Sequence, residues 1–152
     1  MSFFDAIKSG NLSAVKTSLE SDSKLLSQTD AKGFTPLIMA TYSAQNEIVD
    51  YLLEMGADVN QQDAIGNTAL MGVCFKGNEA LATKLLSQGA DVNICNSSNT
   101  TALIYASTFG QNEVAKILIN AGADQSIVDG RGNTALDHAK LQKNDILVGL
   151  LT

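Results

Sequence analysis

The stretch Asp-Ala-Lys-Gly-Phe-Thr-Pro-Leu at residues 30–37 decides the fold, because related stretches return three more times at one spacing. They begin at residues 63, 96 and 129, so the period is 33 residues. Each copy keeps a Thr five residues after its start and a Leu two residues later. A fixed period of this size is typical of a stacked repeat array and not of one closed globule. Such an array works through a long exposed surface and seldom through a catalytic pocket.

The start of each unit predicts a turn followed by a helix. Asp30 can accept hydrogen bonds from its own backbone two residues on, and Gly33 can take a positive φ without penalty. Thr35 is a good N-cap, and Pro36 at the first helical position loses no useful donor. The sequence therefore predicts a short first helix that begins after each of the four threonines.

The second half of each unit predicts a longer, amphipathic helix. In residues 30–62 this helix begins near Glu47 and ends before Gly56, which has the role of a C′ glycine. Its apolar residues recur at helical spacing on one face, where Ile48, Val49, Leu52 and Leu53 lie. One helix pair cannot bury this face alone, but a stack of pairs can.

The whole chain of 152 residues reads as one repeat domain. The expected repeats are 1–29, 30–62, 63–95, 96–128 and 129–152. The first lacks the turn and starts within its first helix. The last ends in a turn rich in apolar residues, namely Leu147, Val148, Leu150 and Leu151. Most of these side chains should face inward, but a leftover apolar strip could bind a second molecule weakly.

Composition and charge exclude several classes of protein. The formal net charge is −6 and no Lys/Arg cluster exists, which argues against nucleic-acid binding and against an anionic membrane surface. No apolar run approaches the ~20 residues of a membrane span, and the N-terminus lacks the pattern of a signal peptide. Two cysteines without a secretory signal favour a reducing compartment, so we expect a cytoplasmic protein.

These repeats resemble the ankyrin repeat family, whose signature is Thr-Pro-Leu-His-x-Ala at a period of 33 residues. The matching stretches start at Thr35, Thr68, Thr101 and Thr134, and Gly-Ala-Asp-Val-Asn occurs at 56–60 and 89–93. The resemblance implies an all-α solenoid of helix pairs with short β-hairpin loops. Departures are the retention of proline only once and the replacement of the signature histidine by Ile38, Met71, Ile104 and Asp137.

The resemblance also implies a protein-binding face made of the hairpins and first helices. Carried over to this sequence, the positions that usually touch a partner include Phe34, Tyr42, Ile65, Phe75, Lys76, Thr108, Phe109 and Arg131. Four of the chain's eight aromatic residues are in this set, and we predict that these four are the energetic hot spots. The alternative is that they pack on the neighbouring first helix and expose little.

No constellation of residues predicts catalysis, a cofactor or a metal. His138 is the only histidine and is expected to be a lone side chain. Cys74 falls at a small-residue position and is expected to be buried, whereas Cys95 precedes a turn and could be exposed. Neither pattern supplies a nucleophile with an oriented base, nor a zinc site. The acidic stripe of Glu47, Asp50 and Glu54 is expected to be a solvated helix face.

We therefore expect a non-catalytic scaffold, a monomer that binds an unidentified partner protein on its concave face. One alternative is a regulator that covers the active site of a partner enzyme. Another is a structural subunit that assembles through its apolar last repeat. An enzyme is the third and weakest alternative.

Overall fold

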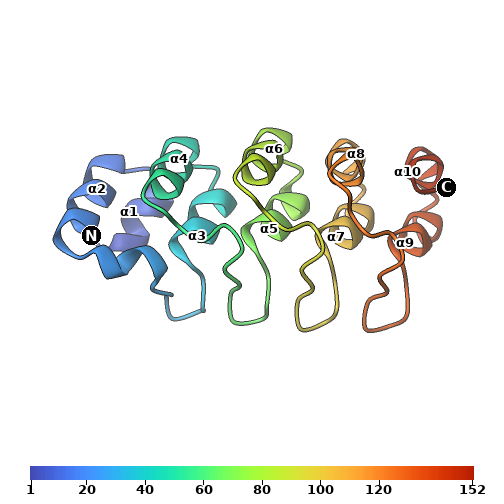
Figure 1. The fold of residues 1–152 in the computed structure, drawn as a ribbon, viewed down its shortest axis with the longest axis horizontal. Coiled ribbons are helices and arrows are strands. Elements are labelled where there is room, and N and C mark those ends of the chain that lie inside the picture. Colours follow the sequence, from blue (N-terminus) through green and yellow to red (C-terminus); the bar gives the residue numbers. More distant parts are fainter.

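The computed structural model describes all residues 1–152 as a row of five helix pairs (Figure 1). The first helices are α1 (Phe3–Ser9), α3 (Pro36–Tyr42), α5 (Ala69–Lys76), α7 (Ala102–Thr108) and α9 (Ala135–Leu141). The second helices are α2 (Leu12–Ser21), α4 (Asn46–Glu54), α6 (Glu79–Ser87), α8 (Asn112–Asn120) and α10 (Asp145–Leu151). The predicted all-α fold is thus confirmed. A short 3-10 helix, η1 (Ser23–Ser27), follows α2 and was not predicted.

The helix pairs lie side by side along the long axis of the molecule. In Figure 1 the second helices form an upper row and the first helices a lower row, from which loops project downward. Each first helix packs against its own second helix and against the first helix of the neighbouring pair. The two ends of the chain therefore lie at opposite ends of an elongated molecule (Figure 1).

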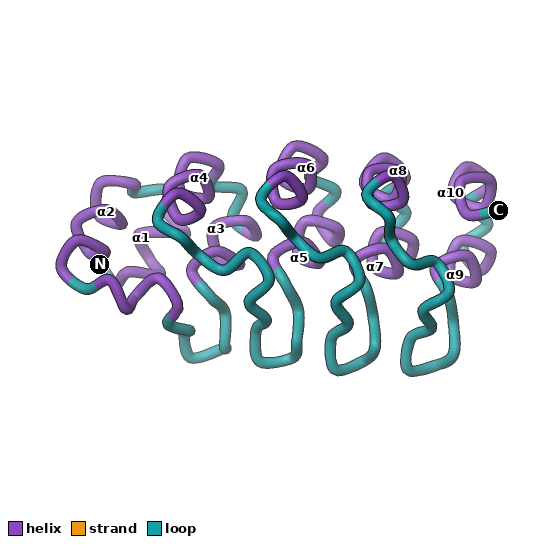
Figure 2. The backbone as a smooth tube through the Cα atoms, in the orientation of Figure 1, coloured by secondary structure: helices purple, strands orange, loops and turns teal.

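The projecting loops have the outline of hairpins but contain no strand (Figure 2). We call them the hairpin loops, residues 30–34, 63–67, 96–100 and 129–133. In the first, the Asp30 N–H donates to the Phe34 carbonyl over 3.0 Å, and the Gly33 N–H donates to the Asp30 carbonyl over 2.9 Å. The Asp30 carboxylate accepts from the backbone N–H groups of Lys32 and Phe34. Side-chain oxygens therefore do the bonding that a longer strand ladder would otherwise provide.

Threonine N-caps start four of the first helices, as predicted. The Thr35 hydroxyl accepts from the Ile38 N–H over 3.1 Å, and Thr68, Thr101 and Thr134 repeat this bond in α5, α7 and α9. In α9 the Asp137 carboxylate also accepts from the Thr134 N–H, which completes a capping box.

The turn between the two helices of every pair contains a residue in the left-handed region. Gly10, Gly77 and Gly110 take φ values of 77°, 76° and 67° there, at no steric cost. The same position holds Ala44 at 53° and Lys143 at 55°, where a Cβ atom is unfavourable. These two turns are imposed by the packing of the helices on either side.

A single apolar core of 32 buried residues runs the length of the stack. Leu52, Leu85 and Leu118 occupy equivalent positions in successive second helices and are completely buried. Polar bonds add to the stacking between pairs. The side-chain carbonyls of Asn60 and Asn93 each accept from the backbone of the next repeat, at Asp91 and Asp124, over 2.8 Å. Each pair is thus held by apolar contacts and by directional bonds to its neighbours.

Candidate protein-binding face

One side of the molecule is formed by the hairpin loops and by α3, α5, α7 and α9, and we call it the first-helix face. Residues at one position, 33 apart, recur near the C-terminal end of each of these helices. They are Tyr42, Phe75, Thr108 and Leu141, and the following position holds Ser43, Lys76, Phe109 and Gln142. The stacking of the helices turns this sequence period into a row of neighbouring side chains.

An aromatic cluster joins α5 to α7 on this face. The rings of Phe75 and Phe109 meet edge to face, with their centroids 4.7 Å apart and their planes at 76°. Tyr105, one turn earlier in α7, stacks on Phe109 at 6.1 Å. Phe75 and Phe109 nevertheless keep 45% and 43% of their surface exposed. The cluster is therefore preorganised but open to solvent, which is the arrangement expected of an anchor site for a partner.

A second contact links α3 to α5. The Lys76 ammonium lies 4.4 Å from the centroid of the Tyr42 ring, a cation–π distance. Tyr42 remains 49% exposed. Sequence reasoning placed both residues on the binding face, but it did not predict that they touch across two repeats.

Two of the remaining predicted site residues contribute less surface. Phe34 is half-buried and packs against the apolar core, so that for this residue the alternative of packing on a neighbour holds. Thr108 is also half-buried, and its hydroxyl donates to the Ile104 carbonyl within α7 over 2.8 Å. By contrast, Ile65 and Arg131 are exposed on two different hairpin loops.

Two exposed apolar residues of the same face were not among the predicted site residues. Leu141 is 70% exposed at the position of Tyr42 and Phe75, and Val128 is 41% exposed next to the last hairpin loop. The period of 33 residues, applied to Tyr42, was a sufficient signal to find Leu141.

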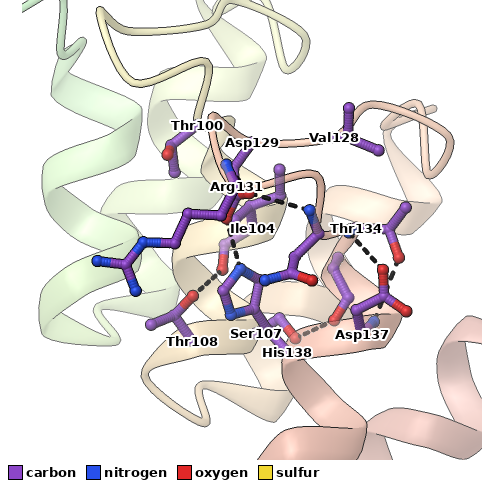
Figure 3. Close-up of polar contacts among 12 residues, drawn as sticks. Thr100, Ile104, Ser107, Thr108, Val128, Asp129, Arg131, Thr134, Asp137 and His138 are labelled. Atoms are coloured by element: carbon purple, nitrogen blue, oxygen red, sulfur yellow. Dashed lines mark hydrogen bonds and ion pairs between the residues drawn. The ribbon is translucent and has the colours of Figure 1, made fainter.

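The expectation that His138 is a lone side chain is wrong. Its Nε2 lies 2.7 Å from Oδ2 of Asp129, so α9 is tied to the hairpin loop before it (Figure 3). Backbone donation from Asn133, assisted by the contact with His138, keeps the pKa of Asp129 below its usual value. In the preceding repeat the same two positions hold Asn96 and Tyr105, which meet over 2.9 Å. The pair therefore supports a loop, with a neutral counterpart in the neighbouring repeat.

The cysteines differ in environment. Cys74 is completely buried in α5, and this burial raises the pKa of its thiol well above the usual range. Cys95 is half-buried beside the third hairpin loop, and both thiols are free. A protonated, inaccessible thiol is inert, so Cys74 is a structural residue.

The acidic stripe on α4 is exposed, as expected. Asp50 pairs with Lys84 of α6 over 2.6 Å, while Glu47 and Glu54 have no ion-pair partner. No three His, Cys, Asp or Glu side chains converge in a way that could hold a metal ion. Nor is any helix long and apolar enough to traverse a bilayer.

Stacked helix pairs with one open aromatic face define a helical-repeat solenoid, a class of protein that acts by surface contact. The comparison with known families makes the class specific. The chain belongs to the ankyrin repeat family, since the family model described as "Ankyrin repeats (3 copies)" matches residues 3–94 and 70–152. Members of this family are generally protein–protein interaction modules.

A curated relative agrees with this assignment. The chain is 41% identical over 58 residues to "Ankyrin repeat and SAM domain-containing protein 6" of Danio rerio. The match covers 38% of this chain and 8% of the relative. The likeness therefore concerns repeats alone, and the whole relative's activity does not transfer with it.

Proposed function

We propose that this chain is a non-catalytic scaffold that binds a partner protein on its first-helix face. The observation that carries the proposal is the exposed edge-to-face pair of Phe75 and Phe109, which joins two repeats without being buried by either. Aromatic side chains dominate the energetics of protein interfaces, because they bury a large area at a small entropic cost. Six of the exposed large apolar residues lie on this face, namely Tyr42, Ile65, Phe75, Phe109, Val128 and Leu141.

The proposal includes a monomer in a reducing compartment such as the cytoplasm. Two free thiols, one of them completely buried, support that setting. The inert environment of Cys74 and the use of His138 in a loop contact both favour a role without chemistry. A regulator that covers a partner enzyme would use the same face, and is one form of the proposed function.

A structural subunit that assembles through the last repeat has less support. Leu147 and Leu151 of α10 are buried within their own helix pair, although Ile146 is 68% exposed. On α9, Asp137 and Lys140 stand at positions where α7 buries Ile104 and Ser107. Polar side chains at these positions suit contact with water better than contact with another apolar surface.

The test combines a pull-down from the source cells with two matched variants. Tyr42, Phe75 and Phe109 are all changed to Ser in the first variant, and the exposed Met55 and Ile146, away from the face, are changed to Ser in the second. A partner captured by the wild type should be lost by the first variant and kept by the second, with both helical circular dichroism spectra intact. Equal titrated affinity of the purified partner for the first variant and the wild type would refute the proposal.

A further inference from the structure

The distribution of charge over the two sides of the solenoid differs from what the net charge suggests. The second helices α4, α6, α8 and α10 carry six acidic side chains, all exposed, and two basic ones. The acidic residues are Glu47, Asp50, Glu54, Glu79, Glu113 and Asp145, and the basic ones are Lys84 and Lys116. Much of the negative charge of the chain therefore lies away from the proposed binding face.

On the first-helix face every fully exposed charged side chain is basic. These side chains are Lys32, Lys76, Arg131 and Lys140. None of the four forms an ion pair, whereas Lys84 on the opposite side is paired with Asp50. In Figure 3 the Arg131 side chain extends away from the Asp129–His138 pair with no dashed line to its guanidinium. The four cations are thus free to meet an incoming anion.

The acidic residues of the same face are already engaged by the fold. Asp30, Asp63 and Asp129 are half-buried, and each carboxylate accepts two backbone N–H bonds inside its own hairpin loop. Asp137 accepts from the Thr134 N–H in the capping box. Because these oxygens point into loops and caps, they oppose an anionic ligand less than their number suggests.

The cations alternate with the apolar anchors. Lys76 directly follows Phe75 and lies over Tyr42, and Lys140 directly precedes Leu141. Arg131 lies three residues beyond the exposed Val128. A ligand that fills the aromatic cluster would therefore bring its own flanking groups next to basic side chains.

We propose that the partner presents to this face an acidic segment in which Asp or Glu residues flank aromatic or aliphatic side chains. This inference rests on the proposed protein-binding function and adds the chemistry of the partner. Charge complementarity of this kind steers the encounter and selects among partners, and it makes the affinity depend on salt. A nucleic acid fits less well, because only four cations are spread over four repeats and the opposite side is strongly acidic.

Selection from a displayed library of random peptides on the intact wild-type chain tests the inference. We expect the selected peptides to be enriched in Asp and Glu next to Phe, Leu or Trp, and to bind more weakly as salt is raised. The variant K76E/R131E should weaken the selected peptides by about tenfold or more. The matched variant K84E/K116E makes the same change in net charge on the second helices and should leave binding unchanged.

The outcomes separate this inference from the proposed function. Neutral or basic peptides that still require Tyr42, Phe75 and Phe109 would overturn the acidic segment and leave the scaffold intact. Acidic peptides that bind K76E/R131E as well as wild type would also overturn it. Binding of a uridine homopolymer, or salt-sensitive self-association detected by light scattering, that K76E/R131E abolishes would assign the face to RNA or to a second copy instead. If no selected peptide depends on the face, both proposals fail.

Discussion

Asp129 and His138 form a short contact that fastens the last hairpin loop to α9, with Oδ2 and Nε2 2.7 Å apart. Both side chains are largely shielded, with 11% and 17% of their surface exposed. The carboxylate also accepts from the N–H groups of Arg131 and Asn133, so its charge contributes to loop order through three partners.

Acid should weaken this loop in a defined direction. Because the pKa of Asp129 is below its usual value of 3.8 when the chain is folded, its ionised form stabilises the native state. That contribution is complete above the unfolded pKa and is lost as the pH falls through the folded one. In D129N the amide can keep the backbone bonds, as Asn96 does. The difference in urea midpoint between wild type and D129N should be constant near neutral pH and shrink below about pH 4. A difference that grows toward low pH would contradict this assignment.

Burial of the second helices predicts a large loss at Leu85. Its side chain is completely buried, and Leu85→Ala removes contacts to the core and leaves a cavity. We expect a loss of roughly 2–5 kcal/mol in the free energy of unfolding, measured by urea denaturation. Thr83→Ala, at an exposed site of the same helix, is the matched control and should change stability little. Equal midpoints for the two variants would show that the helix has been placed in the wrong rotation.

Two inter-helix turns should be improved by glycine. Ala44 and Lys143 have φ values of 53° and 55°, which favour a residue without a Cβ atom. Ala44→Gly and Lys143→Gly should each raise the free energy of unfolding by about 0.5–1 kcal/mol, the gain from relieved strain being partly offset by the larger entropy of glycine in the unfolded chain. The reverse change, Gly77→Ala, should destabilise, since its φ is 76° and a Cβ there would meet the side chain of Gln111. Thermal denaturation of the three variants measures the signs directly.

Thiol chemistry should distinguish the two cysteines. Cys74 is fully buried with a raised pKa, whereas Cys95 is half-buried near a loop. A thiol reagent at neutral pH should label Cys95 in the native chain and reach Cys74 only in denaturant. Cys95→Ser should abolish native labelling. Rapid labelling of native Cys95→Ser would mean that α5 opens far more often than its burial implies.

Much of the fold follows from short-range chemistry that the sequence displays. The threonine N-caps, the apolar spacing of the second helices and the turn residues are local patterns, and the period shows that they repeat. Asn99 was expected to replace a glycine in a turn, and its φ of 55° confirms this. The 3-10 helix at Ser23–Ser27 was missed because no repeat-wide pattern covers it.

The features that sequence reasoning missed are contacts between elements. The left-handed conformations of Ala44 and Lys143 are set by the helices that they join, since neither residue favours that region. The pairing of His138 with Asp129 needs the loop to fold back onto α9. Net charge averages over the surface, so it concealed a first-helix face on which the exposed charges are basic. The eight predicted site residues were chosen by position, and position alone did not distinguish half-buried Phe34 from exposed Leu141.

The amides of Asn60 and Asn93 join each repeat only to the next one, and the helices make their main contacts with adjacent pairs. Such a molecule has no long-range clasp, so tension applied to its two ends is borne by successive junctions in series. Under a pulling force it should lengthen in a sawtooth of similar steps, each releasing the 33 residues of one period, or roughly 110 Å of contour length. The chain is, in mechanical terms, a short extensible spring.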